Sequence, residues 1–103
     1  MTIGPTISEI RTEIRYIITG LPQVDSAFGF GSFFRSEPYN DVDLLIVLDP
    51  KCTSNLEVYY FLKKRFVELG KRLDICIDFT VLTSGEYAEG PLRDMDSLVR
   101  LAP

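Results

Sequence analysis

The 103-residue sequence contains no histidine and no tryptophan. The absence of histidine excludes a serine–histidine–aspartate triad, a cysteine–histidine dyad and a histidine-ligated zinc ion. Two cysteines, Cys52 and Cys76, are too few for a four-thiolate zinc site. We expect both to stay reduced, because a cytosolic domain with two cysteines rarely needs a disulfide. Any catalysis would therefore depend on carboxylates, hydroxyl groups, cations or a bound metal ion.

Long apolar runs are missing as well. No run approaches the ~18 residues of a membrane-spanning helix, and the N-terminus has no basic region followed by an apolar one. The length predicts a single domain, residues 1–103, and the 46% hydrophobic and 25% charged residues are typical of a globular protein. We expect a cytoplasmic domain without a membrane partner.

Positive charge is in deficit, and the formal net charge is −4. This deficit argues against nucleic acid as a partner, because neutralising phosphates requires an excess of lysine and arginine. The cations that gather in one short stretch are interpreted as a solvated helix face and helix C-terminus, with a surface for a partner or a phosphate as the alternative. They are Lys63, Lys64, Arg65, Lys71 and Arg72.

Hydrophobic periodicity predicts the first three elements. Helical spacing of isoleucines over residues 7–19 follows a capping box at Thr6 and Glu9. Alternation over residues 24–30 predicts a strand with Val24 and Phe28 on the same face. Residues 42–48 are apolar on both faces, which predicts a strand at the centre of the sheet.

A second capping box, Ser54 to Glu57, predicts a helix that Gly70 ends. Alternation over residues 73–82 predicts a third strand, and the tail from Ser84 is predicted to form two short helical turns separated by Gly90. The order of elements indicates an α/β (α+β) fold with a small mixed β-sheet flanked by helices. The second helix carries more apolar side chains than one core-facing stripe needs, so part of it is predicted to face another chain. The residues concerned are Tyr59, Tyr60, Phe61, Leu62, Phe66 and Val67.

Acidic residues mark the candidate site. Asp41 and Asp43 are two apart at the start of a strand, so both leave the same face about 7 Å apart at Cα. Paired carboxylates repel unless a cation lies between them, and Mg²⁺ takes one or two carboxylates together with water and phosphate oxygens. Asp78 lies in an apolar strand, and three acids on two strands can hold two ions roughly 3.5–4 Å apart. Asp74 is the alternative third acid, although we favour a role for it as a surface ion-pair partner.

A Gly31-Ser32 pair directly follows the first strand, where backbone N–H groups and a hydroxyl can hold a phosphate. The segment FGSFFRSEPYNDVDLLIV, residues 30–47, resembles the signature of the DNA polymerase beta-like nucleotidyltransferases, and most of all their minimal prokaryotic members. The segment IDFTVLT, residues 77–83, resembles the strand that bears their third acid, and Glu86 follows where they often have an acid. The resemblance covers residues 10–86 and implies the nucleotidyltransferase fold.

The resemblance also implies roles for individual residues. Gly31 and Ser32 would hold the nucleotide phosphates, which Arg35 would also contact. The carboxylates of Asp41, Asp43 and Asp78 would ligate two Mg²⁺ ions, and Asp78 would help to deprotonate the acceptor hydroxyl. The sequence departs from the family pattern at two points, both in the loop between Gly31-Ser32 and Asp41. This loop, residues 33–40, is shorter than is common in the family, and Ser36 stands where the family usually has glycine.

The implied function is a Mg²⁺-dependent transfer of a nucleoside monophosphate, AMP from ATP, to a hydroxyl. By resemblance the acceptor is a tyrosine of a HEPN-like toxin, with this chain as the antitoxin. A homo-oligomer is the alternative assembly. The alternative function is a catalytically inactive binding subunit that acts by protein–protein contact. An antibiotic-modifying enzyme is disfavoured, because a substrate-binding extension is absent.

Overall fold

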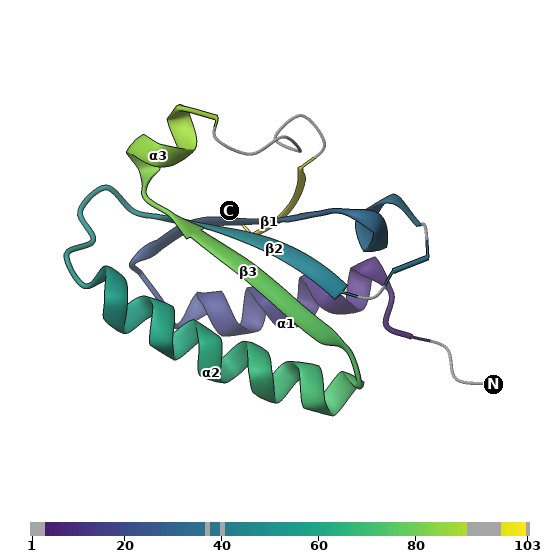
Figure 1. Ribbon diagram of the computed structural model, residues 1–103. Helices are drawn as coiled ribbons and strands as arrows, with labels where there is room; N and C mark the ends of the chain where they lie inside the picture. The colour runs from purple at the N-terminus through teal and green to yellow at the C-terminus, as the bar shows by residue number, and fades with distance from the viewer. Residues whose placement is uncertain (1–3, 37, 40, 91–97, 103) are drawn as a thin grey trace.

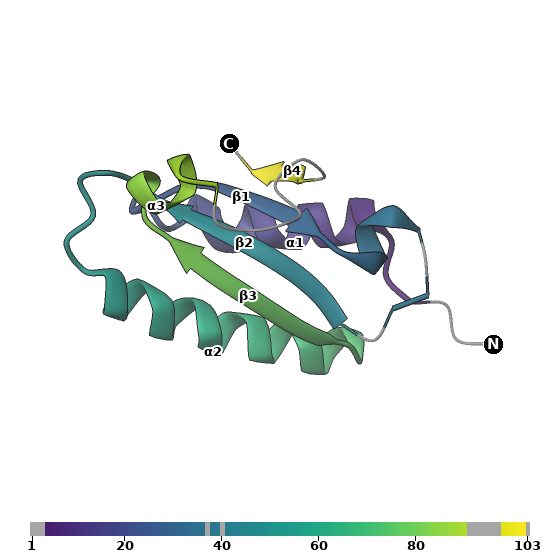
Figure 2. The same ribbon diagram turned by 45° about the horizontal axis from the view of Figure 1, so that its top comes forward.

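The computed structural model of the protein describes residues 4–36, 38–39, 41–90 and 98–102. Its elements are α1 (Ile7–Thr19), β1 (Val24–Phe30), a 3₁₀ turn η1 (Ser32–Arg35), β2 (Asp41–Leu48), α2 (Asn55–Leu73), β3 (Cys76–Leu82), α3 (Ser84–Ala88) and β4 (Val99–Ala102). A four-stranded sheet with the strand order β3-β2-β1-β4 lies at the centre. The long helices α1 and α2 lie along one face of this sheet, and the short helix α3 lies over the other face (Figures 1 and 2). This arrangement confirms the predicted mixed sheet flanked by helices.

The sheet is mixed because of its connections. β1 pairs antiparallel with β2 and with β4, whereas β2 pairs in parallel with β3, since α2 carries the chain back between them. β2 is a central strand, as its apolar pattern predicts. No helix in the described ranges has both the length and the apolarity needed to cross a bilayer.

The main core lies between the sheet and the two long helices. On β2 it takes every second side chain, and these side chains are almost wholly buried. The same alternation sends the intervening residues to the opposite face. The core residues contributed by β2 are Val42, Leu44, Ile46 and Leu48.

The face away from the long helices divides into two parts. Near the end of β2, a smaller apolar cluster gathers around Phe28, Leu45 and Leu82. Tyr87 of α3 covers this cluster and stacks on Phe28 with the ring centroids 5.6 Å apart. Polar residues replace apolar ones near the start of β2 and β3, which leaves a polar stretch at this end of the face.

The first helix has the predicted bounds, but the second does not. The side chain of Thr6 accepts a hydrogen bond from the Glu9 amide, so one half of the predicted capping box is present. Gly70 does not end α2, which continues to Leu73 and is capped by Asp74 in the left-handed region at φ 55°. A Cβ on Gly70 would lie 2.7 Å from the carbonyl oxygen of Ile75. This glycine therefore permits the close approach of the chain entering β3.

The predicted cap of α2 is also wrong, and a cap was missed at α3. The side chain of Ser54 makes no capping hydrogen bond. Thr83 and Glu86 form the reciprocal box instead: the Thr83 amide donates to Glu86 Oε1 (2.9 Å) and the Glu86 amide donates to Thr83 Oγ1 (3.1 Å).

Two further corrections concern β1 and the tail. The β1–β2 register shifts between Val24 and Ser26, so Val24 joins the main core while Phe28 faces the opposite way. The predicted alternation did not allow for this bulge. Within the tail, α3 supplies one of the two predicted helical turns, but residues 99–102 form β4. Most of the second predicted turn lies in residues 91–97, outside the described residues.

Candidate active site

The parallel pairing of β2 and β3 places Asp43 directly opposite Asp78. Neighbouring strands lie about 4.8 Å apart, and side chains at paired positions leave the sheet on the same side. The flanking residues of both strands pack on the long helices, so the two acids face the other way. Asp78 is exposed and Asp43 is half-buried. The fold thus brings together two carboxylates that are 35 positions apart in the sequence.

Asp41 lies two residues before Asp43 on the same face and pairs with Cys76, an exposed free cysteine. We did not predict Cys76 as a neighbour of the site. The available signal was its position two residues before Asp78, which places both side chains on the same face of the strand. In the described part of the chain, no group of three Asp, Glu or Cys side chains is gathered closely enough to hold a metal ion. The pair of Asp43 and Asp78 still fits Mg²⁺, which typically uses one or two protein carboxylates and fills its other positions with water and phosphate oxygens.

The Gly31-Ser32 turn lies against the Asp43 carboxylate. Phe30, the last residue of β1, pairs with Asp43, and the chain then turns at Gly31. Gly31 has φ +84° and ψ −170°, a combination open almost only to glycine. A Cβ at this position would lie 2.6 Å from Asp43 Oδ2. Both the backbone angles and the contact therefore require glycine here.

Two phenylalanines anchor the turn from the core side. Phe33 and Phe34 of η1 are buried, and their rings meet edge to face at 5.0 Å. A Cβ on Gly29 would overlap the ring of Phe34, so this glycine of β1 makes room for the anchor. With the two rings buried in the core, Ser32 stays half-exposed directly after Gly31, and Arg35 is exposed at the end of η1.

Ser36, which follows η1, adopts a left-handed conformation with φ 58°. This is the position at which the resembling family usually has glycine, and the positive φ supplies a physical reason for that preference. The serine takes the conformation at a local cost of about 1–2 kcal/mol.

The paired acids bring two carboxylates to neighbouring strand positions. Two unit charges about 5 Å apart repel by roughly 3 kcal/mol at an effective dielectric constant of about 20. Because Asp78 is exposed, we discount this to about 1 kcal/mol for screening by water and salt. A divalent cation that binds only the folded form would relieve this repulsion.

Asp74, the alternative third acid, does not belong to the sheet. It caps α2 two residues before β3 begins, and it has no partner strand residue opposite it. It also forms no ion pair within the described residues, contrary to our prediction; Arg72 pairs with Glu13 instead, at 2.6 Å. The register therefore brings Asp78, rather than Asp74, to Asp43.

The chain matches no protein-family model and no curated protein sequence. Its structure is similar to the crystal structure of a "putative nucleotidyltransferase" from Sulfolobus solfataricus, with a TM-score of 0.58 and 19% sequence identity. The likeness covers 88% of this chain and 74% of that one. The chain therefore has a nucleotidyltransferase-like fold.

Proposed function

We propose that the protein is a Mg²⁺-dependent nucleotidyltransferase that transfers a nucleoside monophosphate from a triphosphate to a hydroxyl group. The observation that carries this proposal is the convergence, on one open face, of the Asp43–Asp78 pair and the glycine turn pressed against Asp43. The nucleotidyltransferase-like fold supports it. ATP is the nucleotide that the resemblance favours.

In this proposal each residue acts through its position. The Asp43–Asp78 pair would hold magnesium, and Asp41, two residues before Asp43 on the same face of β2, would add a third carboxylate beside the ion. The ion would offset the negative charge that develops on the triphosphate. Gly31 and Ser32 would hold the phosphates, and Arg35 would add a positive charge from the end of η1. Asp78, the most exposed of the acids, would accept the proton of the attacking hydroxyl. The acceptor oxygen then bonds to the α-phosphorus while the bond to the leaving pyrophosphate breaks.

We further propose that the acceptor belongs to another protein. By resemblance, it would be a tyrosine of a HEPN-like toxin. A protein acceptor needs no enclosed pocket, which agrees with an open face on which Asp78 is exposed.

A catalytically inactive binding subunit is the second candidate function. It is favoured by the lack, among the described residues, of any group of three acids or thiols close enough to hold a metal ion. In that case the chain would neutralise or support a partner by contact alone.

The test is incubation of the purified protein with nucleoside triphosphates labelled at the α-phosphate, with and without the product of the neighbouring gene. We expect Mg²⁺-dependent labelling of protein. Either Asp41→Asn or Asp43→Asn should reduce it by about 100-fold or more, because the metal site stabilises the developing charge.

Asp74→Asn is the matched control, since it removes an equal charge from an acid that lies outside the sheet. Its labelling should equal that of the unmodified protein. Undiminished labelling in both Asp41→Asn and Asp43→Asn would contradict the proposal. No labelling with any nucleotide or partner would instead favour the binding subunit.

A further inference from the structure

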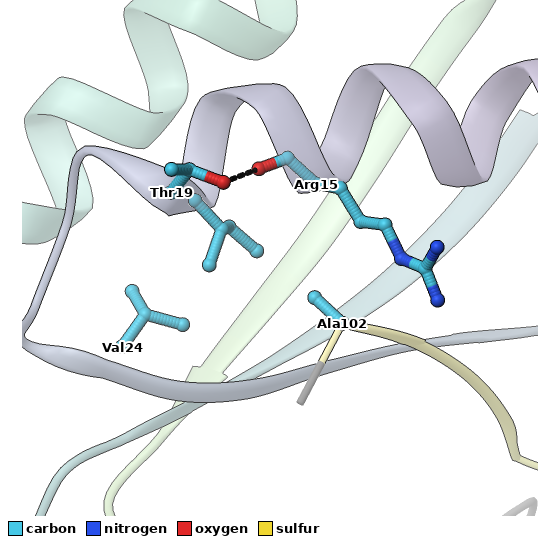
Figure 3. A pocket seen from close by; sticks show the side chains of 5 residues that line it. Arg15, Thr19, Val24 and Ala102 are labelled. Atoms are coloured by element: carbon cyan, nitrogen blue, oxygen red, sulfur yellow. Dashed lines mark hydrogen bonds between the residues drawn. The ribbon is translucent and has the colours of Figure 1, made fainter.

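Figure 3 shows a cavity of about 420 Å³ between the end of α1 and β4. Arg15 and Thr19 line it, but both donate hydrogen bonds within the chain: Arg15 Nε donates to the Leu101 carbonyl, and Thr19 Oγ1 donates to the Arg15 carbonyl. This cavity therefore carries no proposal.

The two edges of the sheet differ in their protection against pairing with another chain. β4, at one edge, has only four residues, includes Arg100, and its register with β1 shifts. β3, at the other edge, has seven residues in one unbroken register with β2. It contains no proline, lysine or bulge, which are features that often prevent edge strands from pairing, and its one charged residue is Asp78. Within the described residues, no strand pairs with the outer side of β3 (Figure 2).

The side chains of β3 that point to the core are incompletely covered. Ile77, Phe79 and Val81 are half-buried, whereas the residues paired with them on β2 are fully buried. The difference arises because β2 has a strand on both sides and β3 has a strand on one side only. A further strand beside β3 would complete the cover.

Helix α2 extends this uncovered surface beyond the strand. At 3.6 residues per turn, Leu56, Tyr59 and Lys63 lie on one flank of α2, and Arg65, which contacts α1, lies on the other. Leu56 is 66% exposed. Leu56 and Tyr59 line a cavity of about 310 Å³ together with Val81 of β3, and we call this the edge cavity. The edge cavity has room for a large apolar side chain from a strand that pairs with β3.

The polar groups at the rim of the edge cavity are already engaged. Thr83 and Glu86 border it, and they bond to each other in the capping box of α3. The contacts that the edge cavity offers are therefore mainly apolar.

We propose that the free edge of β3 binds an extended segment of the acceptor protein, and thereby sets the reactive hydroxyl of that segment beside Asp78. This inference rests on the proposed function. Main-chain hydrogen bonds to β3 would hold the segment. Its alternate apolar side chains would cover the half-buried residues of β3, and one of them would enter the edge cavity. The intervening side chains would lie on the face of the candidate active site.

Strand pairing determines which side chain of the segment reacts. Paired residues on neighbouring strands have Cβ atoms about 5 Å apart and point to the same side of the sheet. Asp78 already lies opposite Asp43, so the residue of the segment opposite Asp78 would continue this row across the active face. A hydroxyl there would give its proton to Asp78 while its oxygen bonds to the α-phosphorus and the bond to pyrophosphate breaks.

The position of α2 argues against a second copy of this chain at the edge. Two β3 strands paired across a two-fold axis would lie about 4.8 Å apart and would bring their α2 helices together on the same face. Tyr59 and Phe66 hold α2 against Phe79 of β3, with ring centroids 5.2 Å and 5.0 Å from that of Phe79. Packed helices need about 8–10 Å between their axes, so these helices would collide. A single extended segment brings no such helix.

The binding test uses random peptides of about nine residues, long enough to span β3, displayed on phage and selected on the immobilised protein without nucleotide. Enriched peptides are synthesised with a fluorescein label, and their binding is measured by fluorescence anisotropy. We expect saturable binding by peptides that carry apolar residues at alternate positions.

N-methylation separates strand pairing from other modes of binding. The N–H groups of successive residues in a strand point to opposite edges, so only every second N–H of the peptide faces β3. Two versions of the best peptide are made, one N-methylated at its odd positions and one at its even positions. One version should bind like the parent peptide, and the other should bind about tenfold or more weakly.

An exposed-site variant locates the contact. Leu56→Ser removes an apolar side chain from the edge cavity and should weaken peptide binding by about tenfold. Tyr16→Ser, on α1, removes a side chain that is 73% exposed away from this edge and should bind like the unmodified protein. Thermal melts confirm that both variants are folded.

The acceptor role is tested with the same peptides. Tyrosine is placed in turn at each position between the apolar residues, and each peptide is incubated with Mg²⁺ and ATP labelled at the α-phosphate. We expect labelling at one position, the one opposite Asp78.

The possible failures are distinguishable because binding is measured without nucleotide. No enriched peptide, equal effects of the two N-methylated versions, or full binding by Leu56→Ser would overturn the proposal. It would also be overturned if no bound peptide is labelled by a protein that labels another acceptor. If peptides bind as expected but no acceptor of any kind is labelled, the proposed function fails and the edge contact is retained.

Discussion

The contact between the glycine turn and the acid pair can be tested by adding a single methyl group. Gly31→Ala forces alanine into φ +84° and ψ −170°, which costs about 1–3 kcal/mol for a residue other than glycine. The new Cβ would also lie 2.6 Å from Asp43 Oδ2, so the turn or the carboxylate must move. Together these effects should lower the free energy of unfolding by about 2–4 kcal/mol, as measured by urea denaturation.

Two other glycines separate the causes. Gly90 also has a positive φ, +63°, but a Cβ there meets nothing within 4 Å, so Gly90→Ala should cost about 1 kcal/mol from backbone strain alone. Gly20 has φ −85° and open space around it, so Gly20→Ala should leave the stability almost unchanged or slightly higher.

A double-mutant cycle isolates the carboxylate contact. In an Asp43→Ala background, Gly31→Ala should cost about 1 kcal/mol less than it does in the unmodified protein, because the atom it strikes is gone. An equal cost in both backgrounds, or a cost no larger than that of Gly90→Ala, would refute the packing of the turn against Asp43.

Three shorter predictions follow from other contacts. Asp78→Asn should melt at or above the unmodified protein without metal, yet gain much less than the ~2.7 kcal/mol expected from Mg²⁺ at 100 times its dissociation constant; equal gains would mean that Asp78 is not a ligand. Ser36→Gly should raise the free energy of unfolding by about 0.5 kcal/mol, since relief of the left-handed strain exceeds the added flexibility of the unfolded chain; a loss of stability would contradict this. The hydrogen bonds from Arg72 lower the pKa of Glu13, so their stabilising effect should be complete above pH ~4.3 and lost as the pH falls through the lowered folded-state pKa. Glu13→Gln should therefore melt lower than the unmodified protein at pH 7 but not at pH 2, and a pH-independent difference would disprove the assignment.

Local signals were enough to predict several elements. The isoleucine spacing and Thr6 predict α1 with its observed bounds, and the alternation predicts β1 as Val24–Phe30. These patterns succeed because each element buries one face against the same core. The aspartates, glycine and serine of the site could likewise be selected, since their order along the chain resembles a known signature.

The misses share a different cause: they depend on neighbours that are distant in the sequence. Gly70 looks like a helix end, but it is inside α2 because the Ile75 carbonyl passes close to it. β4 has only four residues, and its pairing with β1 defines it more than its own sequence does. The Asp43–Asp78 register is also set by strand pairing, so periodicity could place both acids on strands but could not show that they lie opposite each other.

The most direct test of the candidate site is isothermal titration with an ATP analogue that has a methylene group between the α- and β-phosphates and so cannot be transferred. The protein and its Asp74→Asn variant should bind this analogue with the same affinity, and only when Mg²⁺ is present. Asp43→Asn should weaken that binding by about tenfold or more, because it removes a charged ligand that the glycine turn also contacts. No Mg²⁺-dependent binding by the unmodified protein, or equal affinity in Asp43→Asn, would contradict the assignment of this face as a nucleotide site.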